Sequence, residues 1–289
     1  MADGGRIGYY SGSPLRIIED LGILKPNFFP SVPRLLNKIY QTIMAAANAP
    51  GLKAALLRRA IQAKLERLEA TGIDTHPLWD RLVFKKVWEF SVVSFWRSHM
   101  KPKVRQLLGG EIKLIASGSA PLSPKVFNFL RIAFSCIVIE GFGATETCAT
   151  CLRLAPGDPA GAGYVGFPPT CCEAKLCDVP SMGYSVDDKP YPRGELLIRG
   201  DNTFTRYHKS KPPSWFQLWC QAAKSSPLFA DPESTREAKD EEGWVHTGDI
   251  AAIDECGRFK IIDRMKVSLQ STGRVNFILN PGLWLRRTS

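Results

Sequence analysis

This 289-residue sequence has no apolar run long enough to cross a lipid bilayer as a helix, which needs about 18–20 residues. Its first ten residues, MADGGRIGYY, also lack the apolar centre of a secretion signal. We found no internal repeat and no low-complexity tract, so neither a repeat array nor a biased segment is predicted. We therefore expect a globular protein that is soluble or peripheral to a membrane.

The eight cysteines lack the regular spacing of a disulfide framework, which in a chain of this size indicates a reducing compartment. A zinc site is the alternative, because Cys148 and Cys151 have CxxC spacing and three more cysteines lie between residues 171 and 177. We favour it less, because the second cluster lacks the spacing of a zinc ribbon and Cys148 lies inside a different motif.

Acidic residues are too few to balance the basic ones, and the formal net charge is +10. An anionic partner would suit this charge, whether a nucleotide, a coenzyme, a phospholipid surface or a nucleic acid. We favour a simpler interpretation, in which the excess lies on solvated helix faces, with Arg58, Arg59, Lys64 and Arg67 as examples. Since no basic–aromatic motif is present, we predict no nucleic-acid partner.

Periodic apolar residues predict most of the fold. From Pro33 to about Ala70 they recur every three or four positions, with a break near Ala49-Pro50-Gly51, which predicts two amphipathic helices. Residues 112–143 read as strand, helix and strand, with Ser123 as N-cap and Pro124 at the first helical position. Such a unit predicts parallel strands, whose carboxyl ends collect ligands.

From Gly194 onward the sequence becomes rich in β-strand patterns. GELLIRG (194–200) reads as one strand, and DIAAIDECGRFKIID (249–263) as two strands joined at Glu255-Cys256-Gly257. The sequence therefore predicts an α/β fold with a β-rich later part.

Two loops that follow the predicted parallel strands carry candidate binding residues. The first, Gly118-Ser119-Ala120-Pro121, has small side chains that let a flat ligand approach the backbone. The second is GFGATETCAT (141–150), in which Phe142 could stack on a base, Thr145 could bond a phosphate and Glu146 could ligate Mg²⁺. Taken alone, the second loop is equally compatible with an ordinary turn.

Two later segments add a carboxylate and a guanidinium. Asp249 in GWVHTGDI (243–250) follows a glycine at the predicted start of a strand and could accept both hydroxyls of a ribose. Arg264 in IIDRMK (261–266) offers a fork of donors beside Asp263. Either residue could instead stabilise a turn or form a surface ion pair.

In their order along the chain, these segments resemble the adenylate-forming acyl-CoA synthetases, and within them the eukaryotic long-chain fatty acid–CoA ligases. The 240–266 stretch looks like the extended segment that marks fatty acyl-CoA synthetases, which argues against a medium-chain or aryl acid ligase. The matching stretches are residues 4–40, 113–131, 140–147, 192–200 and 240–266.

This resemblance implies the middle and later part of a large adenylation domain and a two-step reaction. A fatty acid carboxylate attacks the α-phosphate of ATP, and the thiol of coenzyme A then displaces AMP from the acyl-adenylate, with Mg²⁺ stabilising the phosphoryl charge. The implied partners are a long-chain fatty acid, ATP or AMP, and coenzyme A. The implied location is the cytosolic face of the endoplasmic reticulum, peroxisome or lipid droplet.

The resemblance also implies a role for each candidate residue. Phe142 stands where the family often has tyrosine, and the stretch Phe28–Tyr40 resembles the lining of the acyl tunnel. The other assignments are adenine contacts by Gly118, Ser119 and Ala120 together with Phe142, a cofactor contact by Gly143, the phosphate at Thr145, Mg²⁺ at Glu146, and the ribose hydroxyls at Asp249 and Arg264.

Two parts of the family pattern have no counterpart, namely the phosphate-gripping loop that ends in lysine and the small C-terminal domain with its adenylation lysine. We therefore expect residues 1–200 to be a partial α/β core, residues 201–266 a β-rich subdomain that ends at the hinge, and the literal chain to be an inactive fragment. The alternative is a non-catalytic AMP- or acyl-binding module derived from such a ligase.

Three stretches depart from the family pattern, namely residues 87–103, 210–230 and 267–289. We interpret them as translated intron, since Val267-Ser268 can be encoded by GTAAGT and removal of 87–103 joins FKK to VRQLLGG. The alternative is that they are real surface insertions whose apolar residues form a membrane-docking patch.

Overall fold

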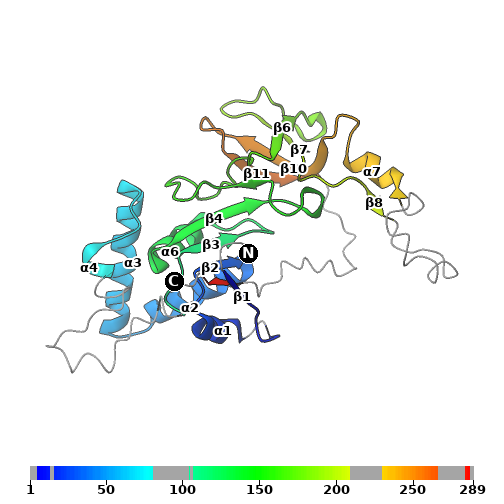
Figure 1. Ribbon diagram of the computed structural model, residues 1–289. Coiled ribbons are helices and arrows are strands. Elements are labelled where there is room, and N and C mark those ends of the chain that lie inside the picture. The colour runs from blue at the N-terminus through cyan, green and yellow to red at the C-terminus, as the bar shows by residue number, and fades with distance from the viewer. Residues whose placement is uncertain are drawn as a thin grey trace, which may run out of the picture. The chain divides into compact units, whose positions relative to one another are not determined.

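A computed structural model describes residues 5–13, 16–80, 104, 107–208, 230–265 and 284–286. The chain divides into two compact units, of which the second comprises Phe142–Arg153 and Val165–Gln270 and the first comprises the rest (Figure 1). Residues 87–103 lie outside the described residues, as do 210–230 except Ala230 and the 267–289 tail except Trp284–Arg286.

The first unit is built on strands in the order β1-β12-β2-β3-β4. Strands β2, β3 and β4 run parallel, which confirms the predicted strand–helix–strand unit. Strand β12 pairs antiparallel with both β1 and β2. The strands are β1 (Arg6–Gly8), β2 (Phe28–Ser31), β3 (Leu114–Ser117), β4 (Ile137–Phe142) and β12 (Trp284–Arg286).

The helices of the first unit confirm the two periodic segments. Helix α2 ends where Ala49 is extended, and Gly51 with φ 113° precedes α3, so the predicted break is present. Ser123 takes the N-cap position of α6, although its side chain makes no capping hydrogen bond. No helix among the described residues is long and apolar enough to span a membrane. The helices are α1 (Ile17–Leu24), α2 (Pro33–Asn48), α3 (Leu52–Thr71), α4 (Pro77–Trp79) and α6 (Pro124–Phe134).

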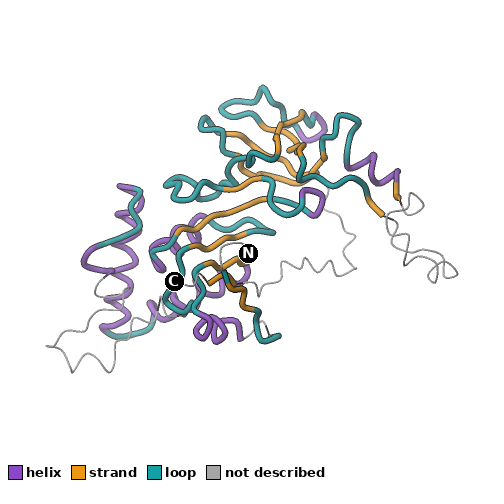
Figure 2. Tube along the Cα trace, viewed as in Figure 1, coloured by secondary structure: helices purple, strands orange, loops and turns teal. Residues whose placement is uncertain are grey.

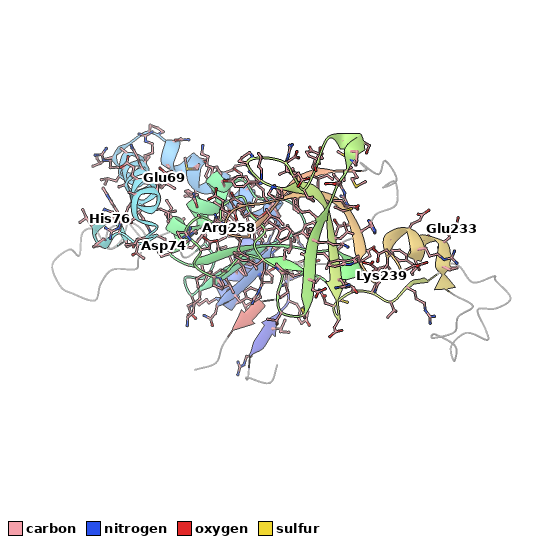
Figure 3. All side chains as sticks on the ribbon, turned by 90° about the horizontal axis from the view of Figure 1, so that it is seen from above. Glu69, Asp74, His76, Glu233, Lys239 and Arg258 are labelled. Carbon is pink, nitrogen blue, oxygen red and sulfur yellow. The ribbon has the colours of Figure 1, made fainter. Side chains whose placement is uncertain are left out.

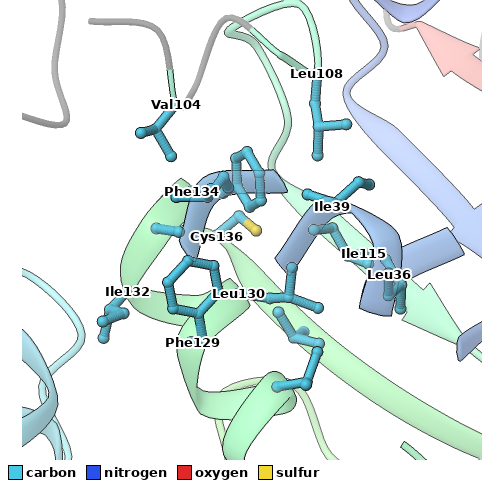
Figure 4. Close-up of a cluster of buried hydrophobic side chains, with 14 of the residues drawn as sticks. Leu36, Ile39, Val104, Leu108, Ile115, Phe129, Leu130, Ile132, Phe134 and Cys136 are labelled. Atoms are coloured by element: carbon cyan, nitrogen blue, oxygen red, sulfur yellow. The ribbon is translucent and has the colours of Figure 1, made fainter. Parts of the chain in front are cut away.

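The hydrophobic core of the first unit lies between its helices and its sheet. Figure 4 shows side chains of α2, β3 and α6 in one cluster, which includes Leu36, Ile115 and Phe129. The ring of Tyr40 meets that of Phe129 edge-on, with centroids 4.9 Å apart. Burying a large apolar side chain stabilises a fold by about 1.5–3 kcal/mol, so this cluster fixes the helices against the strands.

One charged residue of α3, Lys64, lies inside this unit, so its use as an example of a solvated basic residue is wrong. Lys64 is 1% exposed, and its Nζ lies 2.5 Å from Oδ1 of Asp80. The ammonium also donates to the carbonyl of Ile132 and, at 3.2 Å, to the hydroxyl of Ser135. The other carboxylate oxygen of Asp80 accepts from the amide of His76 at 2.8 Å. Lys64 therefore links α3 to α4 and α6.

The second unit is mainly antiparallel sheet, which confirms the β-rich later part (Figure 2). Its larger sheet has the order β11-β10-β7-β6, and β10 and β11 are joined by a turn at residues 254–257, as predicted. Strands β8 and β9 form a separate pair. The elements are β5 (Leu152–Arg153), β6 (Cys172–Cys177), β7 (Arg193–Gly200), β8 (Tyr207–His208), β9 (Ala230–Asp231), α7 (Pro232–Ala238), β10 (Val245–Ile253) and β11 (Phe259–Arg264).

Candidate functional site

The loop after β3 belongs to the first unit and is open to solvent. Ser119 has φ 73°, and both Ser119 and Ala120 are exposed. A Cβ atom at Gly118 would lie 3.6 Å from the carbonyl oxygen of Gly141, which is an ordinary contact. At the far end of the loop, the amide of Leu122 donates to Oε1 of Glu140 at 2.9 Å. The loop is thus anchored to β4 while its small residues stay accessible.

A buried polar row runs beneath the ends of the parallel strands. Ser31, Ser117 and Glu140 pair in register on β2, β3 and β4, so their side chains lie on one face of the sheet. All three are buried, and the two hydroxyls and Oε2 of Glu140 have no hydrogen-bond partner among the described residues. Burial raises the pKa of Glu140 to about 7. The sequence analysis does not predict this row, although each of the three apolar strands carries one of these polar residues.

The loop after β4 belongs to the second unit and is tightly closed. A Cβ atom at Gly143 would lie 1.4 Å from the carbonyl oxygen of Ala149, so only glycine fits there. The hydroxyl of Thr147 accepts from the amide of Ala144 at 2.9 Å, and Cys148 has φ 50°. The same loop holds Phe142, which is half-buried and packs against the core of the second unit.

Thr145 and Glu146 differ in how firmly they are held. Thr145 is exposed in a short 3₁₀ turn, whereas Glu146 is half-buried and its Oε1 accepts from the hydroxyl of Tyr207 at 2.6 Å. The carbonyl of Glu146 accepts from the amide of Phe204 at 2.7 Å. Both carboxylate and backbone of Glu146 are therefore fixed by residues about 60 positions further along the chain. Tyr207 lies in none of the sequence motifs described above, so its contact with Glu146 was not predicted.

A magnesium ion suits Glu146 only if a ligand supplies most of its coordination. The described residues contain no group of three His, Cys, Asp or Glu side chains that could hold a metal. Mg²⁺ commonly binds one or two carboxylates together with substrate phosphates and water. One fixed carboxylate therefore fits an ion that arrives on a nucleotide.

The cysteine pair considered for zinc is poorly suited to it. Cys151 is fully buried, and its burial raises its pKa to about 11, so the thiol stays protonated. Its Sγ lies 3.6 Å from the carbonyl of Phe142, whereas Cys148 is exposed. A structural zinc site needs four ligands close together, and the described residues contain no group of three His, Cys, Asp or Glu side chains that could hold a metal.

Asp249 and Arg264 meet in the second unit. The sequence predicts Asp249 at the start of a strand, but β10 begins at Val245, so Asp249 lies inside the strand. It pairs in register with Arg264 on β11, whose Nε lies 3.2 Å from Oδ1 of Asp249. Burial raises the pKa of Asp249, Arg264 opposes this, and Glu195 adds to it.

A bulge sets the direction of Asp249. The register between β10 and β7 shifts between His246 and Ile250, and Gly248 within this shift has φ 68°. Glu195 on β7 accepts from the amide of Gly248 at 3.1 Å and contacts Nδ1 of His246 at 3.1 Å. Bulges re-aim side chains next to functional sites, and this one presents the carboxylate of Asp249 beside an exposed guanidinium.

The candidate residues are thus divided between the units. The second unit contains the loop with Phe142, Gly143, Thr145 and Glu146, together with the Asp249–Arg264 pair, and the first contains Gly118, Ser119 and Ala120. The residues that sequence reasoning missed are Glu140, Glu195 and Tyr207.

Comparison with known proteins identifies relatives of the chain. The family model described as AMP-binding enzyme matches residues 1–208. The peroxisomal long chain acyl-CoA synthetase 7 of Arabidopsis thaliana is 39% identical over 264 residues, which cover 91% of this chain and 32% of that protein. Long-chain-fatty-acid–CoA ligase 5 of Rattus norvegicus is 38% identical with the same coverage. The chain therefore spans about a third of the length of these relatives.

Solved structures give a matching fold. The adenylation domain of a carboxylate reductase from Mycobacterium chelonae has a TM-score of 0.55 and 26% identity, covering 86% of this chain and 28% of that one. The corresponding domain from Segniliparus rugosus, in complex with AMP and a co-purified carboxylic acid, has a TM-score of 0.52 and 26% identity, with coverage of 86% and 29%. The α/β fold with parallel and antiparallel sheets thus matches an adenylation domain.

Proposed function

The chain belongs to the AMP-binding enzyme family, and from that premise we propose that it carries nucleotide-binding parts of a long-chain fatty acid–CoA ligase. The observation that carries this proposal is the similarity to long-chain acyl-CoA synthetases over 91% of the chain. The complete reaction joins a long-chain fatty acid to coenzyme A through an acyl-adenylate, at the expense of ATP.

In this proposal, Gly118, Ser119 and Ala120 are the candidate adenine contacts of the first unit, and Phe142 and Gly143 are the candidates of the second. Small exposed residues and a loop closed by glycine suit a flat ligand. Asp249 accepts from the ribose hydroxyls, and Arg264 donates beside it. The bulge at Gly248 and the 3.2 Å ion pair support this pairing of roles.

Thr145 and Glu146 are the proposed contacts to phosphate and to Mg²⁺. When bound, Mg²⁺ neutralises charge on the phosphoryl group. The residues of this chain orient and bind: the exposed hydroxyl of Thr145 donates to a phosphate oxygen, and Glu146 presents a carboxylate already fixed by Tyr207.

Location and domain limits are part of the same proposal. Relatives from Arabidopsis thaliana are named peroxisomal, which supports a peroxisome among the three compartments considered. Peripheral membrane contact is a further part of the proposal. We also propose that residues 87–103, 210–230 and 267–289 are translated intron. The first of these stretches interrupts a partial α/β core at residues 1–200, and the second interrupts a β-rich subdomain at residues 201–266. Reads of the mature transcript that retain the three stretches would overturn the intron assignment.

The test measures AMP binding to the 289-residue chain by calorimetry. Asp249→Asn should weaken binding about tenfold or more, because hydrogen bonds to a charged group contribute about 1.5–3 kcal/mol. Asp263→Asn is the matched control, since that carboxylate lies next to Arg264 but bonds Tyr184. Equal losses in both variants, or no AMP binding by the unmodified chain, would contradict the assignment.

A second assay separates the ligase from the binding-module alternative. The chain is supplied with ATP, Mg²⁺, coenzyme A and fatty acids of graded length, and acyl-CoA is measured. Turnover that peaks with long chains supports a ligase active in this chain itself. AMP binding without turnover supports the nucleotide-binding role alone.

A further inference from the structure

Tyr207 forms the shortest hydrogen bond described at the candidate phosphate and metal residues. It lies on β8, 61 residues from Glu146, and its hydroxyl donates to Oε1 of that carboxylate at 2.6 Å. A tyrosine hydroxyl is a hydrogen-bond donor at neutral pH, so it suits a carboxylate oxygen as its partner. The proposed function uses this side chain only as the hydrogen-bond partner of Glu146.

The position of Tyr207 is itself set by several contacts within the second unit. Its amide donates to the hydroxyl of Thr235 in α7 at 3.0 Å, and its backbone pairs with Asp231 on β9. Its ring lies against that of Phe204, with centroids 4.6 Å apart. Because the backbone and ring of Tyr207 are fixed by these contacts, its hydroxyl can fix the orientation of the Glu146 carboxylate.

Lys239 strengthens the same arrangement from the end of α7. Figure 3 shows Glu233 and Lys239 at opposite ends of this helix. The ammonium of Lys239 donates to the carbonyl of Phe204 at 2.9 Å, and the amide of Phe204 donates to the carbonyl of Glu146. Glu146 is thus approached through its backbone and its carboxylate by one connected group of residues.

The bond from Tyr207 engages Oε1, one of the two carboxylate oxygens of Glu146. Residues that hydrogen-bond a metal-ligating carboxylate fix its orientation, and their loss commonly costs about 10–100-fold in metal affinity or activity. We propose that Tyr207 is a positioning residue, whose hydroxyl orients Glu146 to ligate a divalent cation carried by a nucleoside triphosphate. The inference rests on the proposed role of Glu146.

The experiment measures ATP affinity by calorimetry with and without Mg²⁺, and AMP affinity without Mg²⁺, on the full chain. Tyr207→Phe should lower the Mg²⁺-dependent gain in ATP affinity about tenfold while leaving AMP affinity unchanged. Glu146→Gln should remove the gain. Tyr184→Phe is the matched control, because its phenol also donates to a carboxylate of this unit, that of Asp263 at 3.1 Å, and it should keep the gain.

Each failure has its own signature. If Glu146→Gln keeps the Mg²⁺-dependent gain, or if the unmodified chain has none, the metal assignment in the proposed function fails. If Glu146→Gln loses the gain but Tyr207→Phe keeps it, only the role of Tyr207 fails. Equal loss of AMP and Mg²⁺–ATP affinity in Tyr207→Phe shows a structural role and overturns the proposal.

A second measurement avoids any change of fold. With 3-fluorotyrosine at position 207, the fluorine resonance should shift when Mg²⁺ and ATP are added together and much less with ATP alone. The same label at position 184 should not respond to Mg²⁺. Identical spectra with and without Mg²⁺ at position 207 overturn the proposal.

Discussion

Lys64 and Asp80 in the first unit form an ion pair whose side chains are 0% and 4% exposed, whereas Arg264, paired with Asp249 in the second unit, is 66% exposed. Removing one partner of a buried pair leaves an uncompensated charge, but an exposed partner remains hydrated. The first unit therefore uses charge to hold helices together. The second keeps charge where a dissolved ligand can reach it.

Two carboxylates only six residues apart extend this contrast. Glu140 in the first unit is buried, accepts one amide hydrogen bond and has its pKa raised to about 7. Glu146 in the second unit is half-buried and accepts a phenol hydroxyl. The same type of side chain thus anchors one loop from a buried position and remains partly accessible in the other loop.

The largest effect is expected from breaking the buried pair. Lys64→Met should lower the free energy of unfolding by about 3–5 kcal/mol, because Asp80 is left charged and buried. Urea denaturation measures the loss, and the double variant Lys64→Met with Asp80→Leu should recover part of it. A loss below about 1 kcal/mol for the single variant would mean that the pair is not buried in solution.

The anchor carboxylate should make stability depend on pH. The folded protein holds the proton on Glu140 up to about pH 7, whereas an unfolded glutamate releases it near its ordinary value of about 4.3. The stability that this group contributes is therefore fully present below about pH 4.3 and is lost as the pH rises toward about 7. The total loss is on the order of 3 kcal/mol, and little changes above about pH 7.

Glu140→Gln keeps an acceptor for Leu122 but cannot ionise, so the variant should gain stability relative to the unmodified chain as pH rises from about 4.5 to 7. Denaturation curves at pH 5 and pH 8 measure this gain. A difference between the two proteins that is the same at both pH values would show that Glu140 does not titrate in this range.

The two glycine loops should respond differently to one added methyl group. Gly143→Ala forces a Cβ into the carbonyl of Ala149 and should cost about 1–3 kcal/mol, because the backbone must shift. Gly118→Ala meets only an ordinary contact and should leave stability nearly unchanged, while weakening AMP binding if adenine packs there. Thermal denaturation and calorimetry of both variants test this, and equal destabilisation would contradict it.

The smallest effect is expected at an exposed pair of the second unit. Glu173 accepts from Arg199 at 2.6 Å, but the two side chains are 61% and 42% exposed. Glu173→Gln should therefore cost about 0.5 kcal/mol, and the cost should shrink in 0.5 M salt, a concentration of about three times the physiological value. If Glu173→Gln lowered the free energy of unfolding by several kcal/mol regardless of salt, the exposed pair would behave like the buried Lys64–Asp80 pair, and the contrast between the two would be wrong.

The fold was predictable where local pattern and tertiary structure agree. The helices α2 and α3, the parallel pair β3 and β4, and the antiparallel pair β10 and β11 all have the periodicity of their final form. The break before α3 was predictable because proline and glycine interrupt a helix. These features depend on neighbours in sequence, which a single chain displays.

Contacts between distant segments could not be predicted in this way. Lys64 was expected to be solvated because it is charged, although it lies three residues after Ile61 and four before Leu68, on the apolar face of α3. Its bond to the carbonyl of Ile132, 68 residues away, had no signal in the sequence. The loops that hold Glu146 and Asp249 were found from their composition, whereas Tyr207 became visible only through its bond to Glu146. The bulge that re-aims Asp249 depends on β7, which lies about 50 positions earlier in the chain.

The β8–β9 pair has a practical consequence for protein engineering. Tyr207 and Asp231 are register partners, so the end of β8 and the start of β9 lie side by side. Loop-closure entropy rises by only about 0.6 kcal/mol for each doubling of a flexible loop, so the connection between such points tolerates large changes in length. A fluorescent reporter or a short turn placed between them would leave the two ends where they are, which makes this position a natural graft site.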